Sequence, residues 1–173
     1  GTITRQVNFG TSTSTALVKV TTDWLGRTIQ EERPAPPGAS PSTFTLTLTY
    51  NSLGQLTKRT QPGLADTLYS YDTLGALFRE GLDVGANGTI DLASSDRITE
   101  RGYTFFTSGS NWWSRQTTTT YATASSSTAT QVGKVETQLS GLATNRLSRT
   151  DSYDIFGNVT TQYVDVNRGG KTV

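Results

Sequence analysis

Polar and apolar residues alternate most clearly between residues 43 and 50. Phe44, Leu46, Leu48 and Tyr50 occupy every second position, and threonines lie between them. Because successive side chains of a strand point to opposite faces, this pattern predicts a strand with one apolar and one hydroxyl-rich face. Related patterns predict strands near residues 2–9, 15–22, 27–32, 55–60, 67–71, 76–81, 97–107, 112–122, 128–139, 145–153 and 158–166. No segment has a helical stripe with caps, so we expect an all-β chain.

A short phrase recurs between neighbouring predicted strands. It consists of Tyr, then Asp or Asn, two variable residues and Gly. Asp or Asn can start a turn by bonding the backbone two residues on, and Gly can adopt the left-handed conformation that closes a bulged hairpin. The second variable residue is always Leu or Phe, which predicts that each turn tip packs against a neighbour. The predicted turn residues are Asp23 and Gly26 in a degraded copy that begins with Thr22, then Asn51 and Gly54, Asp72 and Gly75, and Asp154 and Gly157.

The spacing of the phrase indicates a repeat unit with insertions. By subtraction, Gly54 and Gly75 are 21 residues apart, whereas Gly26 and Gly54 are 28 apart. The longer interval contains residues 33–41, which hold four of the five prolines and are expected to form a loop at the rim of the sheet. From Gly75 to Gly157 is 82 residues, close to four such units. Residues 83–150 are therefore expected to contain diverged repeats within a single module spanning 1–173.

The strings YNSLGQLT, YDTLGALF and YDIFGNVT resemble the repeat of the RHS/YD-repeat family. That family is named for a Tyr-Asp pair followed by Gly and then by Arg-Leu or a similar pair. The resemblance implies consecutive antiparallel hairpins in a strongly curved or spiralling sheet, part of a hollow shell that often encloses a toxic C-terminal segment. Related repeats form barrels in large cell-surface adhesion proteins. The implied partners are the remaining repeats of the same parent protein and an enclosed toxin polypeptide.

Composition narrows the fold and the function. Thr supplies roughly a fifth of the residues, and β-branched side chains favour strands. Only 33% of residues are hydrophobic and the mean hydropathy is −0.42, which favours a thin or hollow β-architecture over one with a thick core. The formal net charge of +1 provides no general attraction to nucleic acid or acidic membranes. We therefore expect no nucleic-acid binding. No membrane span is evident, so we expect no membrane insertion either.

Missing residue types argue against an enzyme. Without His the chain has no Ser-His-Asp triad or His-based metal site, and without Cys it has no thiolate chemistry. No spacing pairs the carboxylates across a cleft, so acids on strand ends and turns are the simpler interpretation; the candidates are Glu31, Glu32, Asp83, Asp91, Asp96 and Glu100. Because the chain begins with Gly1 in place of Met, it is expected to be a processed or excised piece of a longer protein.

Residues 83–94 partly match a calcium-binding loop. Asp83, Asn87 and Asp91 fall at positions one, five and nine of that template, and Gly88 falls at the sharp turn. However, Gly85 and Ser94 replace the ligands at positions three and twelve. An ordinary Asn-Gly reverse turn explains the same residues, so no cofactor is expected apart from calcium as a candidate.

Trp112 and Trp113 are candidates for carbohydrate binding, because aromatic faces stack on sugar rings. Adjacent residues of a regular strand point to opposite faces, so packing of at least one indole against the sheet is the simpler interpretation.

Three functional hypotheses follow. The chain is a structural section of a shell around an effector, an extracellular adhesion or carbohydrate-binding module, or a calcium-stabilised form of either, and in each case it is secreted or at the cell surface.

Overall fold

The computed structural model describes residues 3–9, 16–121, 127–140, 147–165 and 171–172. In this part of the chain the protein is all-β, with no helix, as the alternation predicted. The strands are Ile3–Phe9 (β1), Ala16–Thr22 (β2), Thr28–Pro34 (β3), Thr43–Tyr50 (β4), Leu56–Thr60 (β5), Asp66–Tyr71 (β6), Leu77–Asp83 (β7), Arg97–Ser108 (β8), Asn111–Tyr121 (β9), Thr130–Gln138 (β10), Leu147–Tyr153 (β11), Val159–Asp165 (β12) and Lys171–Thr172 (β13). Each predicted strand is present, and only the two-residue β13 was not expected.

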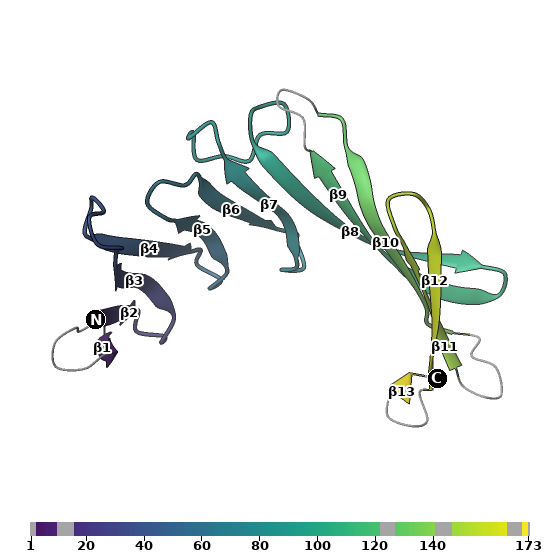
Figure 1. Ribbon diagram of the computed structural model, residues 1–173. Helices are drawn as coiled ribbons and strands as arrows, with labels where there is room; N and C mark the ends of the chain where they lie inside the picture. The colour runs from purple at the N-terminus through teal and green to yellow at the C-terminus, as the bar shows by residue number, and fades with distance from the viewer. Residues whose placement is uncertain (1–2, 10–15, 122–126, 141–146, 166–170, 173) are drawn as a thin grey trace. The chain divides into compact units, whose positions relative to one another are not determined.

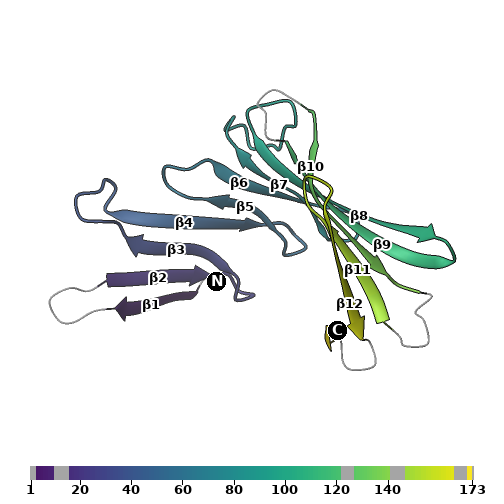
Figure 2. The ribbon, with the colours of Figure 1, turned by 45° about the vertical axis from the view of Figure 1, so that its right-hand side comes forward.

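The strands form an open sheet in which the order of the strands follows their order along the chain. Consecutive strands are antiparallel, so the expectation of successive hairpins is confirmed. The chain divides into two compact units, residues 1–70 with 81–90 and residues 71–80 with 91–173, called unit 1 and unit 2. Figure 1 shows the hairpins β1 to β5 of unit 1, and Figure 2 shows β8 to β12 of unit 2 side by side.

Neither unit has a thick apolar interior in its described residues. The buried apolar side chains are Leu68, Ile98 and Tyr121, whereas the buried polar ones are Asp83, Asp96, Ser114, Glu136 and Asp151. The low hydrophobic content therefore corresponds to a sheet whose faces are covered mainly by polar and charged side chains. In such a sheet, pairs between side chains on neighbouring strands carry much of the stability.

The proline-rich segment connects β3 to β4. Pro34 is the last residue of β3, and the Ala35 N–H donates to the Ser42 carbonyl at 2.9 Å, which closes the base of the loop. Because proline has no N–H, the loop prolines cannot extend the strand ladder, and pairing stops where they begin.

Candidate functional site

The four recurring turns have one common geometry. In each, the side-chain oxygen of the first residue accepts the N–H groups two and four positions later, at 2.8–3.0 Å. The glycine N–H donates to the carbonyl of that first residue at 3.0–3.1 Å. The first residues are Asp23, Asn51, Asp72 and Asp154, and the glycines are Gly26, Gly54, Gly75 and Gly157 with φ of +80°, +83°, +86° and +83°. These roles are those that the sequence predicted.

The degraded copy is as regular as the others, although Thr22 stands where the other copies have Tyr. The Asp23 N–H donates to the Arg27 carbonyl at 2.9 Å, as the Asn51 N–H does to that of Gln55. The turn therefore depends on Asp or Asn and on Gly, and not on the preceding aromatic residue. The strand register also shifts beside the first two turns, at Thr21/Thr22 and Thr49/Tyr50, which is the predicted bulge.

The prediction that the turn tips pack against a neighbour is wrong within this chain. Leu53, Leu74 and Phe156 are 81%, 92% and 83% exposed. The side-chain oxygen of Asp or Asn and the positive φ of Gly already close the turn through the backbone, so the tip needs no packing to hold its conformation. The tips extend past the strand ends and meet solvent.

Replacing Asn51 by alanine is expected to lower the free energy of unfolding by about 1 kcal/mol, because two N–H groups lose their acceptor. The side-chain N–H of Asn51 also donates to Gln55 Oε1 at 2.7 Å, and this bond is lost as well. Asn51→Asp is the matched control and should change stability by less than about 0.5 kcal/mol, since the other copies carry Asp. Urea unfolding followed by circular dichroism measures both. Equal losses would show that the side-chain acceptor does not hold the turn.

Five strands lie between Gly75 and Gly157 in the described residues, as the alternation pattern predicted. They are β7 to β11, fewer than the eight strands that four regular two-stranded units would contain, so the repeats in this interval are not regular two-stranded units. The excess length lies in β8 and β9, of 12 and 11 residues, and in loops. The turn at Asp72 precedes β7 and the turn at Asp154 follows β11. β7 and β11 are four antiparallel steps apart and therefore run in the same direction. Because one turn lies at the start of β7 and the other at the end of β11, the two turns lie at opposite ends of the strands.

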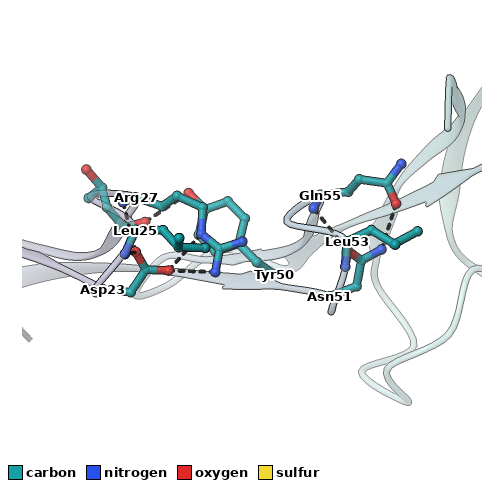
Figure 3. A network of polar contacts seen from close by, with 8 residues as sticks. Asp23, Leu25, Arg27, Tyr50, Asn51, Leu53 and Gln55 are labelled. Atoms are coloured by element: carbon teal, nitrogen blue, oxygen red, sulfur yellow. Dashed lines mark hydrogen bonds and ion pairs between the residues drawn. The ribbon is translucent and has the colours of Figure 1, made fainter. Parts of the chain in front are cut away.

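Arg27 joins the first turn to the second (Figure 3). Its Nε and Nη2 lie 2.7 and 2.6 Å from Asp23 Oδ2, and its guanidinium lies 4.7 Å from the centroid of the Tyr50 ring. The Tyr50 hydroxyl donates to the Thr28 carbonyl at 2.9 Å. Burial raises the pKa of the Asp23 carboxyl, but the hydrogen bonds from Arg27 and Leu25 outweigh it and lower that pKa. A charged pair and a cation–π contact thus connect consecutive hairpins.

Tyr153 makes the same kind of contact in unit 2. Its hydroxyl donates to Glu136 Oε2 at 2.9 Å, and Lys134 Nζ lies 3.6 Å from its ring centroid. In both cases the tyrosine before the turn bonds an acceptor of the preceding strand, while a nearby cation lies over its ring. In these two copies the Tyr at the start of the phrase therefore joins its strand to the preceding one.

Glu136 and Asp151 form the centre of a charged network on β9 to β12. Glu136 is 8% exposed and accepts from Arg115 Nε at 2.7 Å, with Lys134 Nζ at 3.3 Å. Asp151 is 4% exposed; Arg149 Nε donates to its Oδ1 at 2.9 Å, and the Thr161 hydroxyl donates to the same oxygen at 2.6 Å. Register places Glu136 directly opposite Asp151. The cations around them keep two neighbouring carboxylates ionised on one face.

Both carboxyls have lowered pKa values. Burial raises the pKa of each, but hydrogen bonds outweigh it: those from Arg115, Tyr153 and Lys134 lower the pKa of Glu136, and those from Arg149 and Thr161 lower that of Asp151. A carboxyl whose pKa is lower in the folded state stabilises the fold above its unfolded-state pKa. That contribution is lost as the pH falls through the folded-state pKa.

The melting temperature is therefore expected to change little between about pH 5 and 7 and to fall steeply below about pH 4. Asp151→Asn should melt lower than the wild type at pH 7 and lose less between about pH 5 and 2.5, because one of the responsible carboxyls is gone. Differential scanning calorimetry across this range measures both. A variant whose curve runs parallel to that of the wild type would exclude Asp151 as a source of the acid sensitivity.

Of the predicted calcium-loop residues, Asp83, Asn87 and Gly88 lie in a tight turn of unit 1, whereas Asp91 belongs to unit 2. In unit 1, Asp83 is 4% exposed and its two oxygens accept the N–H groups of Asn87 at 3.1 Å and Gly88 at 2.7 Å. The Asn87 side chain accepts the Thr89 N–H at 2.9 Å. In unit 2, the Asp91 N–H donates to Asp96 Oδ2 at 3.0 Å. The described part of the chain contains no group of three or more Asp, Glu, His or Cys residues arranged to hold a metal. Calcium binding stays a prediction, and a calorimetric titration would test it.

Trp112 and Trp113 point to opposite faces of β9, as expected for adjacent strand residues. Trp112 is 53% exposed. Trp113 stacks on Phe106 with ring centroids 6.3 Å apart, and Arg149 lies 6.0 Å from its ring. The two indoles therefore do not form one flat platform.

The contacts described above were not predicted from the sequence for Arg27, Glu136, Asp151 or Tyr153. A usable signal was present in part, because Arg27 is the residue directly after the turn glycine and Tyr153 belongs to the phrase. The pairing of Glu136 with Asp151 depends on the register of two strands joined through residues 139–146, which no local pattern specifies.

The sequence matches no protein-family model, and no curated protein is significantly similar to it. Within the described residues, no helix is long and apolar enough to cross a membrane.

Proposed function

We propose that this chain is a non-catalytic section of the wall of an RHS-type shell, secreted or at the cell surface, that encloses a C-terminal effector. The observation that carries the proposal is the common geometry of the four turns. A turn that closes itself through Asp or Asn and Gly can be repeated along a chain without requiring the same neighbours each time. Repetition of this kind is typical of structural arrays.

The faces of the sheet support the same function. A wall that encloses a polypeptide needs a surface that stays hydrated and does not bind its contents tightly. Ion pairs between neighbouring strands cover much of this sheet, including Lys19 with Glu32, Lys58 with Asp66, and Arg79 with Glu100 at 2.5–3.0 Å. The edges would pair with the remaining repeats of the parent protein, because an open strand edge presents unpaired N–H and C=O groups.

The natural gene product that contains this sequence provides the test. Electron microscopy is expected to show a hollow β-shell, and limited proteolysis should spare an enclosed polypeptide until the shell is opened by denaturant. The matched comparison is the same product with Gly54→Val, which should expose the enclosed segment at lower protease concentration. A protein without a lumen, or one whose segments are all cleaved at equal rates, would contradict the proposal.

A second candidate is a carbohydrate-binding or adhesion module, and one surface favours it. Tyr103, Phe105 and Trp112 are 62%, 59% and 53% exposed, and the register of β8 and β9 places all three on one face. Tyr103 and Phe105 pack edge to face with centroids 5.1 Å apart. A glycan array would test it. Binding lost in Trp112→Ala and kept in Trp24→Ala, which removes another exposed indole, would favour this function over the shell.

A further inference from the structure

We propose that a hollow on one face of β3, β4 and β5 binds a small monocarboxylic acid with an aromatic or short aliphatic body. The hollow has a volume of about 280 Å³ and lies within unit 1. Its apolar lining consists of Phe44 and Leu46 of β4 together with Pro34 and Pro36. Volumes near this are at the lower end of the range for ligand pockets, so the ligand is small.

The charges around the hollow favour an anion. Three charged residues line it, Glu31, Arg33 and Arg59. Arg33 forms an ion pair with Glu31, so these two charges compensate each other. The side chain of Arg59 makes no hydrogen bond or ion pair with the described residues, and register places it opposite Leu48, on the face that carries Leu46 and Phe44. One positive charge beside this apolar lining therefore has no partner in this part of the protein.

A guanidinium in this position selects a carboxylate. Its planar fork of N–H groups matches the two oxygens of a carboxylate, and it is more weakly hydrated than an ammonium. The other cation of β5, Lys58, is bound to Asp66 at 2.6 Å and is not available. An acid with an apolar body would place its carboxylate on Arg59 and its ring or chain over Phe44 and Leu46. This inference does not depend on the shell proposal.

The test is a titration of the 173-residue chain with 3-phenylpropionate, followed by NMR amide shifts. Shifts are expected in β3 to β5, with a Kd on the order of 0.1–1 mM for a ligand of this size. The neutral amide 3-phenylpropanamide, which keeps the ring and removes the charge, should bind at least tenfold more weakly. No shifts up to about ten times that Kd, or equal binding of the acid and the amide, would overturn the proposal.

Arg59→Gln should raise the Kd at least tenfold, and Arg59→Lys should give an intermediate value because it keeps the charge and loses the fork. Arg97→Gln is the charge-matched control and should leave the Kd unchanged, since Arg97 lies in unit 2 and bonds the Ser95 carbonyl. The Arg59 side chain makes no hydrogen bond or ion pair with the described residues, so its replacement removes no such contact. The melting temperatures of the Arg59 variants should therefore equal that of the wild type. Unchanged affinity in a folded Arg59→Gln would also overturn the proposal.

Discussion

Replacing Gly54 by valine is expected to lower the free energy of unfolding by about 3 kcal/mol. Two effects combine at this position. Gly54 has φ of +83°, a conformation that strains a β-branched residue. In addition, a Cβ at Gly54 would lie 2.9 Å from Arg27 Nη1, so the guanidinium must move. Its movement weakens the contacts with Asp23 and Tyr50 that join the first two turns. Urea unfolding measures the change.

The matched control is Gly26→Val. Gly26 has a similar φ of +80°, but no atom lies within 4 Å of the Cβ position. Only the backbone strain applies there, so the expected loss is smaller, about 2 kcal/mol. The difference between the two variants isolates the Arg27 contact. If Gly26→Val and Gly54→Val cost the same, Arg27 does not connect the hairpins energetically.

Replacing Glu136 by leucine is expected to cost about 2 kcal/mol, because Arg115, Lys134 and the Tyr153 hydroxyl all lose their common acceptor. The loss falls short of that for a fully buried ion pair, since the Arg115 side chain is 39% exposed and water reaches it. A second readout reports on the site itself. The hydrogen bond to Glu136, together with burial, raises the pKa of the Tyr153 phenol. In the variant that pKa should fall toward its ordinary value, as an ultraviolet titration would detect.

Glu100→Leu provides the comparison for Glu136. Among the described residues, the side chain of Glu100 bonds only Arg79, with 2.5 Å between Glu100 Oε2 and Arg79 Nη2. The Glu100 side chain is 23% exposed. A pair of this kind is worth about 1 kcal/mol or less. A loss as large as that of Glu136→Leu would mean that any cross-strand carboxylate contributes equally and that the Glu136 network has no special role.

Much of the fold could be read from local patterns. Strand positions followed from alternation, because a strand exposes successive side chains to opposite faces whatever surrounds it. The turns followed from Asp or Asn and Gly, because both act within five residues through backbone geometry. The failed expectation concerned interactions beyond that range. Leu53, Leu74 and Phe156 did not pack against a neighbour in this chain.

The sequence alone was sufficient to specify the all-β class, the hairpin order and the roles of residues such as Asp72 and Gly75, since each depends on neighbours a few positions away. The register of the strands was needed to bring Glu136 opposite Asp151, to place Arg27 over Tyr50, and to leave Arg59 beside Phe44 without a partner among the described residues. The physical reason is that a shift of one residue in register moves every side chain to the other face, while the local pattern of each strand stays the same.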